Sequence, residues 1–320
     1  MHIVIPDNLD QAGLDILDAV EGISYLAPAK MTREELLNAA DSADGLIIRS
    51  ASTIDAEALA AFSKLKAIAR AGVGVDNVDL DVATERGVVV MNAPDGNTIA
   101  TTEHTFAMML ALSRYIPQAY NSMRDGKWDK KSFMGVELRG KTLGIIGFGR
   151  IGRALAKRAQ AFEMNVIAYD PYIPAEAAQQ TGVALLDLDE LYTRADYISL
   201  HSLVTDETRG MINAQSIGKM KDGVRIINVA RGAFINDADL AAAIQSGKVA
   251  GAAVDVFVKE PPPQDHPLLG LNGVLHTPHL GASTVEAQNE VAVQAAQNLL
   301  KALLKGEYNN VVNPAVLAKL

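Results

Sequence analysis

The chain has 320 residues, a length that favours two domains, and a formal net charge of −9. Hydrophobic residues make up 49% of it and charged residues 21%, which is the composition of a globular protein. The negative charge argues against a nucleic-acid surface, and the absence of cysteine excludes disulfides and a thiolate nucleophile. No stretch reaches the roughly 18–20 uninterrupted apolar residues of a membrane span, and the N-terminus lacks signal-peptide features, so we expect a cytoplasmic protein.

The first 98 residues alternate short apolar runs with amphipathic stretches. Strands are predicted at 2–6, 23–27, 45–50, 65–72 and 88–92, and helices near 9–20, 32–40, 55–62 and 79–86. This alternation is typical of βαβ units and predicts a parallel, doubly wound sheet.

A second alternation follows a long predicted helix over 99–120 and a polar loop over 124–135. Strands are predicted near 142–147, 165–169, 195–200, 224–229, 250–255 and 273–276. Ser283 followed by Glu286 fits a capping box, which predicts a helix from about 284 to 305. The tail over 310–314 is expected to be a short strand or an extended arm. The chain is therefore predicted to be an α/β protein with two sheet domains.

Three glycines form a G-x-G-x-x-G pattern between a strand and a helix, at Gly147, Gly149 and Gly152. In this context the pattern favours a dinucleotide cradle, because glycines permit the tight turn and the close approach of a pyrophosphate to the helix N-terminus. The next strand ends in Asp170, whose carboxylate can accept bonds from ribose hydroxyls and would repel a 2′-phosphate. NAD is therefore expected rather than NADP, the alternative being a glycine turn beside a surface aspartate.

Arg231, Glu260 and His279 each follow an apolar run that is predicted to be a strand. Because the carboxyl ends of parallel strands share one edge, these side chains can converge. A guanidinium that grips a carboxylate, an imidazole that takes a hydroxyl proton and a carboxylate that fixes the imidazole tautomer suit the oxidation of a 2-hydroxy acid. The alternatives are a surface salt bridge for Arg231, a solvated charge for Glu260 and a structural role for His279. His201 ends another strand, where a cofactor-side or a packing role suits it.

Five long motifs resemble the D-isomer-specific 2-hydroxyacid dehydrogenases, and most closely the branch that oxidises 3-phosphoglycerate. They lie at 70–79, 92–105, 126–152, 228–237 and 277–284. The resemblance implies a Rossmann NAD-binding domain over 99–286 and a discontinuous, flavodoxin-like substrate domain over 1–98 and 287–320. It also implies that Arg231 binds and polarises the substrate, Glu260 tunes the histidine and His279 is the acid/base. The residues expected at the NAD site are Gly147, Gly149, Arg150, Ile151, Gly152, Asp170, His201, Ser202, Val229, Ala230, Asp255, Gly281 and Ala282. No metal site is expected.

The substrate carboxylate is expected to meet backbone N–H groups of Val73 and Gly74, because this glycine-rich loop can present amides to an anion. A phosphate would need further donors, which Arg49 and Arg70 can supply from neighbouring strand ends, with Ser50 and Ser52 adding hydroxyls. Each arginine could instead belong to a structural ion pair.

The expected activity is NAD-dependent oxidation of D-3-phosphoglycerate to 3-phosphohydroxypyruvate, the first step of serine biosynthesis. One alternative is a reductase that acts on glyoxylate, on hydroxypyruvate or on another 2-oxo acid to give a D-2-hydroxyacid. The other alternative is a non-enzymatic, NAD-sensing adaptor. The chain is expected to be a short form without a serine-binding regulatory domain. The resemblance also implies a homodimer through 99–140, with the loop around Trp128, Lys130 and Lys131 approaching the neighbouring subunit. No nucleic-acid or membrane partner is expected.

Overall fold

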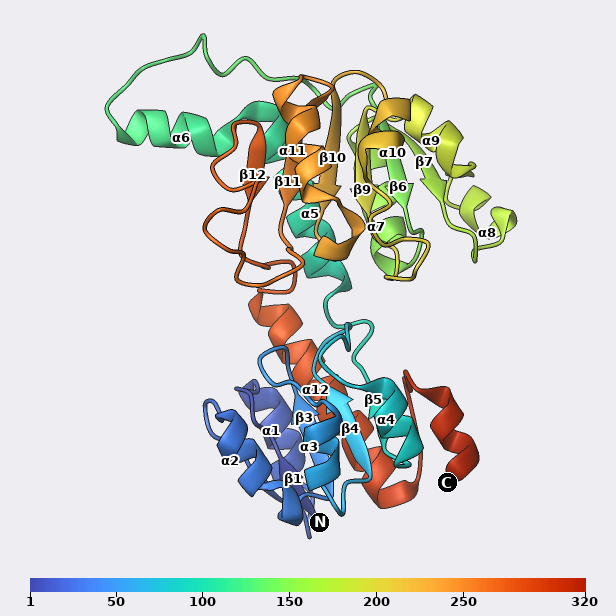
Figure 1. The fold of residues 1–320 in the computed structure, drawn as a ribbon. Coiled ribbons are helices and arrows are strands. Elements are labelled where there is room, and N and C mark those ends of the chain that lie inside the picture. The colour runs from blue at the N-terminus through green and yellow to red at the C-terminus, as the bar shows by residue number, and fades with distance from the viewer. The chain divides into compact units, whose positions relative to one another are not determined.

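The computed structural model describes residues 1–320, which form two units (Figure 1). Unit 1 consists of Met1–Asn97 and Ser283–Leu320, and unit 2 of Thr98–Ala282. The sequence argument places the two boundaries at 98/99 and 286/287, whereas the structure divides the chain at 97/98 and 282/283.

Unit 1 is a five-stranded sheet in the order β2-β1-β3-β4-β5, with every pair parallel. This is the doubly wound 2-1-3-4-5 order. Its strands are β1 (His2–Val4), β2 (Ser24–Leu26), β3 (Gly45–Ile48), β4 (Ala67–Arg70) and β5 (Val89–Met91). Its helices are α1 (Gln11–Asp18), α2 (Arg33–Asn38), α3 (Ala56–Ala61), α4 (Leu80–Glu85) and α12 (Val285–Lys305), with short 3₁₀ turns η1 (Ala40–Ser42) and η3 (Pro314–Lys319).

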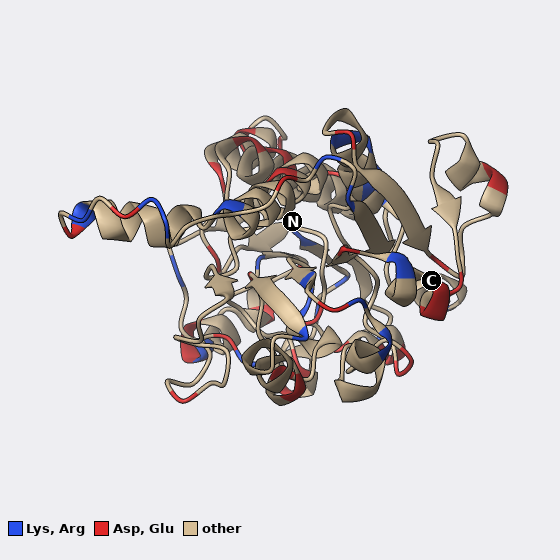
Figure 2. Ribbon diagram, turned by 90° about the horizontal axis from the view of Figure 1, so that it is seen from above, with Lys and Arg blue, Asp and Glu red and all other residues tan.

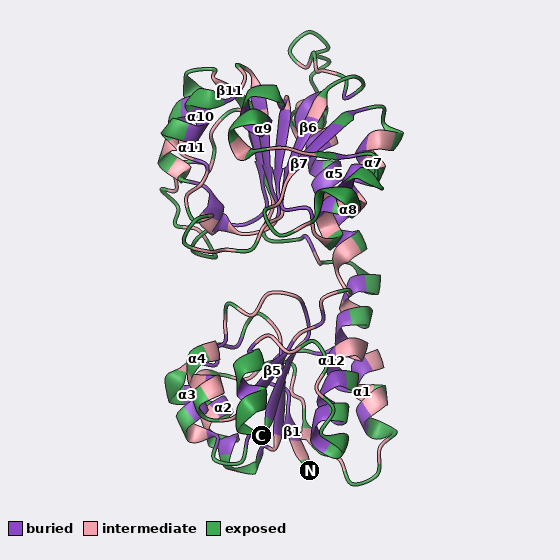
Figure 3. Cartoon of the chain, turned by 90° about the vertical axis from the view of Figure 1, so that its right-hand side faces the viewer, coloured by how far each residue is buried: buried purple, intermediate pink, exposed green.

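Both faces of this sheet are covered, so its strands are apolar on both sides. Side chains of α1 and α12 pack on one face around Ile3 and Ile47. Helices α2, α3 and α4 pack on the other around Leu46 and Ile68. Figure 3 shows the buried strands between helices whose outer faces are exposed.

The C-terminal part of unit 1 differs from the sequence argument in its helix cap. The N-cap of α12 is Thr284, whose side chain accepts from the N–H of Ala287. The capping box of Ser283 and Glu286 is therefore wrong, because the helix begins one residue later and Glu286 is its second residue. The tail is an extended arm, in which the N–H of Val312 donates to the carbonyl of Val90.

Unit 2 is a seven-stranded parallel sheet in the order β12-β11-β10-β9-β6-β7-β8. Counted within the unit this is 7-6-5-4-1-2-3, an extension of the nucleotide-binding order 3-2-1-4-5-6. The strands are β6 (Thr142–Ile146), β7 (Asn165–Tyr169), β8 (Ala184–Leu185), β9 (Tyr197–Leu200), β10 (Val224–Asn228), β11 (Val249–Val254) and β12 (Val274–His276). The two-residue β8 is too short to give a pattern, and the sequence argument missed it.

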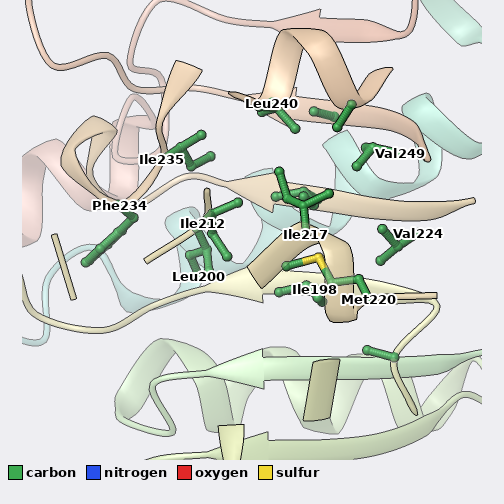
Figure 4. Packing of buried hydrophobic residues seen from close by; sticks show 14 of the residues in the cluster. Ile198, Leu200, Ile212, Ile217, Met220, Val224, Phe234, Ile235, Leu240 and Val249 are labelled. Carbon is green, nitrogen blue, oxygen red and sulfur yellow. The ribbon is translucent and has the colours of Figure 1, made fainter. Parts of the chain in front are cut away.

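The core of unit 2 fills both faces of this sheet. On one face Ile198, Ile226 and Leu240 belong to a buried apolar cluster, part of which Figure 4 shows. On the other face Met109 of α5 and Leu155 of α7 pack against the strands. The helices of the unit are α5 (Thr98–Arg114), α6 (Ile116–Arg124), α7 (Arg150–Ala161), α8 (Ala175–Gln179), α9 (Leu188–Arg194), α10 (Ala214–Lys219) and α11 (Asp237–Gln245), with the 3₁₀ turn η2 (Gly232–Phe234).

The single helix predicted over 99–120 is wrong, because α5 and α6 are separated at Tyr115. Tyr115 has a left-handed backbone, with φ 54°. Pro117 explains the break, since in a continuous helix it could not donate to the carbonyl of Ser113 and its ring would collide with that group. The Ser113 carbonyl instead accepts from the N–H of Val136. Figure 1 shows α6 and the segment after it extending away from the rest of unit 2.

Acidic and basic segments are interspersed along the helices and loops of both units (Figure 2). No helix is both long and apolar enough to cross a bilayer.

Candidate active site

Three neighbouring strands of unit 2 deliver the three candidate catalytic side chains to one edge of the sheet. Arg231 lies just after β10, Glu260 in the loop after β11, and His279 just after β12. Strand β11 pairs in parallel with β10 on one side and with β12 on the other, so the carboxyl ends of all three strands share an edge. The expected convergence therefore has its structural basis in strand order.

His279 and Glu260 form a hydrogen-bonded couple. The His279 Nδ1 lies 2.7 Å from Glu260 Oε2. The other oxygen, Oε1, accepts from the backbone N–H of Phe257 at 3.0 Å, which orients the carboxylate. Because a carboxylate only accepts, Nδ1 must carry the proton in the neutral ring, which leaves the Nε2 lone pair able to take a proton. The His279 side chain as a whole is 48% exposed.

The loop that carries His279 is held in place by Asp255. The His279 backbone has φ 56°, a left-handed conformation that is uncommon for a non-glycine residue and must be maintained by its surroundings. Its N–H donates to the Asp255 carbonyl at 2.8 Å. The Asp255 carboxylate accepts from the next two N–H groups, those of Leu280 at 2.8 Å and Gly281 at 2.9 Å. Asp255 therefore fixes three consecutive backbone donors around the candidate base.

Two further side chains complete this arrangement, and sequence reasoning assigned neither of them a role. Thr277 Oγ1 donates to Asp255 Oδ1 at 2.5 Å, and His104 Nε2 on α5 lies 3.1 Å from that hydroxyl and 3.3 Å from Asp255 Oδ1. Burial by itself raises the pKa of the Asp255 carboxyl, but the hydrogen bonds from His104, Thr277 and the Leu280 N–H outweigh it and the pKa is lowered. No local pattern in the sequence connects residues so far apart.

The Arg231 loop is organised by the amide of buried Asn228. Its Nδ2 donates to the Arg231 carbonyl at 2.8 Å, and its Oδ1 accepts from the Ala230 N–H at 3.1 Å. A Cβ on Gly232 would lie 2.1 Å from the carbonyl carbon of Phe257, so only glycine allows this loop to pack against the loop that carries Glu260. The Arg231 Nη1 donates to the Ala230 carbonyl at 2.7 Å.

The glycine loop between β6 and α7 fits the pyrophosphate of a dinucleotide. Gly147 has φ 96°, and a Cβ there would lie 2.5 Å from backbone atoms of His201 and Ser202. A Cβ on Gly152 would lie 2.3 Å from the Gly147 carbonyl oxygen, so that glycine serves the close packing of helix on strand. Gly149, the N-cap of α7, faces open space and no side chain caps the helix, which suits the binding of an anion at this helix N-terminus.

Asp170 lies at the end of β7, directly beside this loop. Its Oδ2 accepts from the Phe148 N–H at 2.8 Å, and its Oδ1 from the Tyr172 N–H at 2.9 Å. Each oxygen keeps a second lone pair for a ribose hydroxyl. The strand order changes direction between β6 and β9, and such a point is where doubly wound sheets bind nucleotides.

His201 directly follows β9, at the point where the strand order changes direction. Its Nε2 lies 2.7 Å from Ser199 Oγ, while its Nδ1 is buried and has no hydrogen-bond partner. Burial lowers the pKa of the His201 ring to about 4, so the ring is neutral at physiological pH. Of the other residues expected at the NAD site, Val229 and Gly281 are buried, Arg150 is exposed, and Ile151, Ser202, Ala230 and Ala282 are partly buried.

A cavity of about 430 Å³ adjoins the His279–Glu260 couple within unit 2. It is mainly apolar and is lined by Phe257, Glu260, Pro261, Pro262, Leu269, His276, Thr277, Pro278 and His279.

In unit 1 the candidate anion-binding groups gather at the carboxyl ends of β3 and β4. Arg49 follows β3 and Arg70 ends β4, and these two strands pair in parallel. The Arg49 guanidinium contacts the carbonyl of Asn8 and the side chain of Gln288. The N–H groups of Val73 and Gly74 make no hydrogen bond within the protein and are partly accessible.

The two serines of this loop differ in availability. Ser50 is exposed. Ser52 is buried, and its hydroxyl donates to the buried carboxylate of Asp7 at 2.8 Å. The Asp7 carboxylate also accepts from the Arg49 N–H at 2.6 Å. Ser52 therefore stabilises the loop, and its proton is not available to a ligand.

The comparisons with known proteins assign the family. Residues 106–281 match the D-isomer specific 2-hydroxyacid dehydrogenase, NAD binding domain, and the chain belongs to this family. It is 47% identical to a D-3-phosphoglycerate dehydrogenase of Archaeoglobus fulgidus over 98% of this chain and 59% of that protein. Among solved structures, a glyoxylate reductase from Paecilomyes thermophila is 31% identical with a TM-score of 0.88, covering 98% of both chains. A D-lactate dehydrogenase from Aquifex aeolicus, complexed with NAD and lactic acid, is 28% identical with a TM-score of 0.85, covering 98% of this chain and 99% of that one.

These matches confirm the expected fold and NAD as the cofactor. The chain spans about three fifths of the length of the curated dehydrogenases that it matches.

Proposed function

We propose that the chain catalyses the NAD-dependent oxidation of D-3-phosphoglycerate to 3-phosphohydroxypyruvate, which opens the route to serine. The observation that carries the reaction type is the couple of His279 and Glu260 at 2.7 Å, on the same sheet edge as Arg231. The substrate is supported by curated relatives named D-3-phosphoglycerate dehydrogenase, which are 43–50% identical to the chain, and each matches over most of it.

In this proposal His279 is the general base. Its Nδ1–H keeps donating a hydrogen bond to Glu260 while its Nε2 takes the proton of the substrate hydroxyl, and the carboxylate stabilises the resulting imidazolium. Arg231 binds the substrate carboxylate with its planar fork and polarises the carbon that becomes the ketone. NAD, when bound, accepts the hydride. The glycine loop and Asp170 hold the pyrophosphate and the ribose, and His201, Ser202, Val229, Ala230, Gly281 and Ala282 line the same site.

Unit 1 is the substrate domain in the same proposal. The free N–H groups of Val73 and Gly74 receive the carboxylate, and Arg49 and Arg70 receive the phosphate, with Ser50 as a further donor. Each charge-assisted hydrogen bond contributes about 1.5–3 kcal/mol, so two arginines together favour a phosphorylated substrate by about 100-fold or more in kcat/KM.

A steady-state comparison of D-3-phosphoglycerate with D-glycerate, each with NAD and NADP, tests the proposal. We expect a preference for the phosphorylated acid of about 100-fold and a clear preference for NAD. Arg49→Ala and Arg70→Ala should raise KM for phosphoglycerate far more than for glycerate. Arg33→Ala is the matched control, because this arginine of unit 1 pairs with Asp55 and Glu57 on the surface. Equal losses on both substrates would remove the phosphate role.

Reduction of glyoxylate or hydroxypyruvate is the second candidate, since the glyoxylate reductase has the same fold over its whole length. The same assay panel with these oxo acids and NADH decides between the two. Turnover of none of these acids, with NADH binding intact, would favour an NAD-sensing adaptor.

We further propose a cytoplasmic homodimer that associates through 99–140. The support for the dimer is that α6 has no buried residue and that Ile116, Tyr120, Met123 and Trp128 are exposed by 52–78%. Sedimentation of the wild type and of Trp128→Ser tests the dimer. Cell fractionation tests the location.

A further inference from the structure

The loop that carries Glu260 is anchored by a pair of side chains that lies outside the couple with His279. His266 Nε2 lies 3.0 Å from Asp237 Oδ2, and the two side chains are only 10% and 20% exposed. The N–H of Leu268 donates to His266 Nδ1 at 3.4 Å, so Nδ1 is the acceptor, and Nε2 carries the hydrogen and donates it in a hydrogen bond to Asp237 Oδ2. Leu268 itself is fully buried in the core of unit 2, which fixes this part of the loop.

The His266 ring reaches the carboxylate of Glu260 through one intermediate residue. The ring of Phe257 meets the His266 ring edge-on, with centroids 5.1 Å apart. The backbone N–H of the same Phe257 is the donor that orients Glu260 Oε1. Phe257 therefore contacts the imidazole with its ring and orients the Glu260 carboxylate with its backbone N–H.

The Asp237 end of the pair reaches the Arg231 loop. Asp237 is the first residue of α11, and α11 follows the 3₁₀ turn that begins at Gly232, immediately after Arg231. Gly232 packs against the backbone of Phe257, with no space for even a Cβ. The pair thus joins the β10 loop to the β11 loop at the place where both present their polar groups. Burial raises the pKa of the Asp237 carboxyl, and His266 counteracts this shift.

We propose that His266 and Asp237 are positioning residues for Glu260, which hold the loop after β11 at the place where the carboxylate meets His279 Nδ1. This inference rests on the proposed function for its catalytic consequence, although the coupling itself can be observed without substrate. It assigns a role to a histidine that local sequence places only beside prolines. The physical basis is that removing one partner costs more free energy in a hydrogen-bonded pair that is shielded from water than in an exposed one, and this pair is largely shielded.

A double-mutant cycle tests the coupling. His266→Gln keeps a donor to Asp237 but removes the ring against Phe257, and His266→Leu removes both. We expect kcat to fall about tenfold in His266→Gln and up to about 100-fold in His266→Leu, with NADH affinity within about threefold of wild type. In a Glu260→Gln background the same substitutions should have almost no further effect, because the group through which they act is gone. Equal costs in both backgrounds would overturn the proposal.

Asp237→Asn, which retains an acceptor oxygen, should have a kcat within about threefold of wild type. Asp237→Ala, which removes the hydrogen bond but keeps the ring against Phe257, should lower kcat further, though less than His266→Leu does. His2→Gln is the matched control, since His2 contacts only Ser24 through its ring. If His266→Leu does not fold, the kcat of His266→Gln is compared with that of Asp237→Asn. A larger loss in His266→Gln supports the proposal, and equal values contradict it.

The second readout is the ¹⁵N spectrum of the His279 ring in the absence of substrate, assigned with His279→Asn. It reports which nitrogen carries the proton. Wild type should show the proton on Nδ1, Glu260→Gln should lose this preference, and His266→Leu should move towards Glu260→Gln. A wild-type pattern in His266→Leu would refute the inference even if the dehydrogenase activity is established. Absence of turnover with an intact coupling in the spectrum would refute only the proposed function.

Discussion

The variant Gly149→Ala tests whether the loop between β6 and α7 binds the cofactor or is only a glycine turn. Gly149 has φ −73° and ψ −153°, which a residue with a Cβ can adopt, and that Cβ would meet no protein atom within 4 Å. Gly→Ala at a compatible position stabilises by about 0.4–1 kcal/mol through the unfolded state. The preference of the N-cap for glycine over alanine offsets this gain. The free energy of unfolding should therefore change by less than about 1 kcal/mol, and Tm by less than about 4 °C.

The effect on the cofactor should be large by contrast. The added methyl group extends into the open space at the N-terminus of α7, and in the proposed cradle a bound pyrophosphate would have to move away from it. Loss of one charge-assisted hydrogen bond costs about 1.5–3 kcal/mol, which corresponds to a rise in the Kd for NADH of about 10- to 100-fold. Fluorescence titration with NADH and thermal unfolding of the same sample measure both quantities.

Two other glycines of unit 2 provide controls. Gly218→Ala, inside α10 and facing open space, should raise Tm slightly and leave the Kd unchanged. Gly147→Ala should destabilise the protein, because φ 96° is strained for alanine and the Cβ would lie 2.5 Å from backbone atoms. Wild-type NADH affinity in Gly149→Ala would show that this helix N-terminus does not hold the pyrophosphate.

Three further outcomes follow from the geometry of unit 2. His279→Asn should lower kcat by about 10²–10⁴ while the Kd for NADH stays nearly constant, and full activity would exclude the base role. Asp255→Ala should lower the free energy of unfolding by about 2–4 kcal/mol, because the N–H groups of Leu280 and Gly281 lose their acceptor. Urea denaturation measures this change, and a loss below about 1 kcal/mol would contradict the role of Asp255. Stability should fall as the pH drops from about 6.5 towards 4, since the unfolded chain protonates His201 while the folded ring, with its pKa lowered to about 4, does not. The gap corresponds to roughly 3 kcal/mol, and His201→Asn should flatten this part of the pH profile.

The positions of the strands and of the glycine loop followed from the sequence because they depend on local patterns. Apolar runs separated by amphipathic stretches predicted the parallel strands, and they placed Arg231, Glu260 and His279 after three of these strands. Parallel strands end on one edge, so a local pattern sufficed to bring distant residues to one face. The break at Tyr115 was also foreseeable in principle, since Pro117 stands four residues after Ser113 and cannot continue the helix.

Only the tertiary structure determined the contacts that hold the candidate catalytic side chains in position at the carboxyl-terminal edge of the unit 2 sheet. His104 reaches Asp255 across 151 residues of sequence, and His266 reaches Asp237 across 29. Neither pair has a repeat or a motif that would connect its members. Hydrogen bonds of this kind depend on side-chain positions of about an ångström, which arise from the packing of whole helices on the sheet. The sequence thus determined which groups arrive at the edge, and the packed fold determined how they are held.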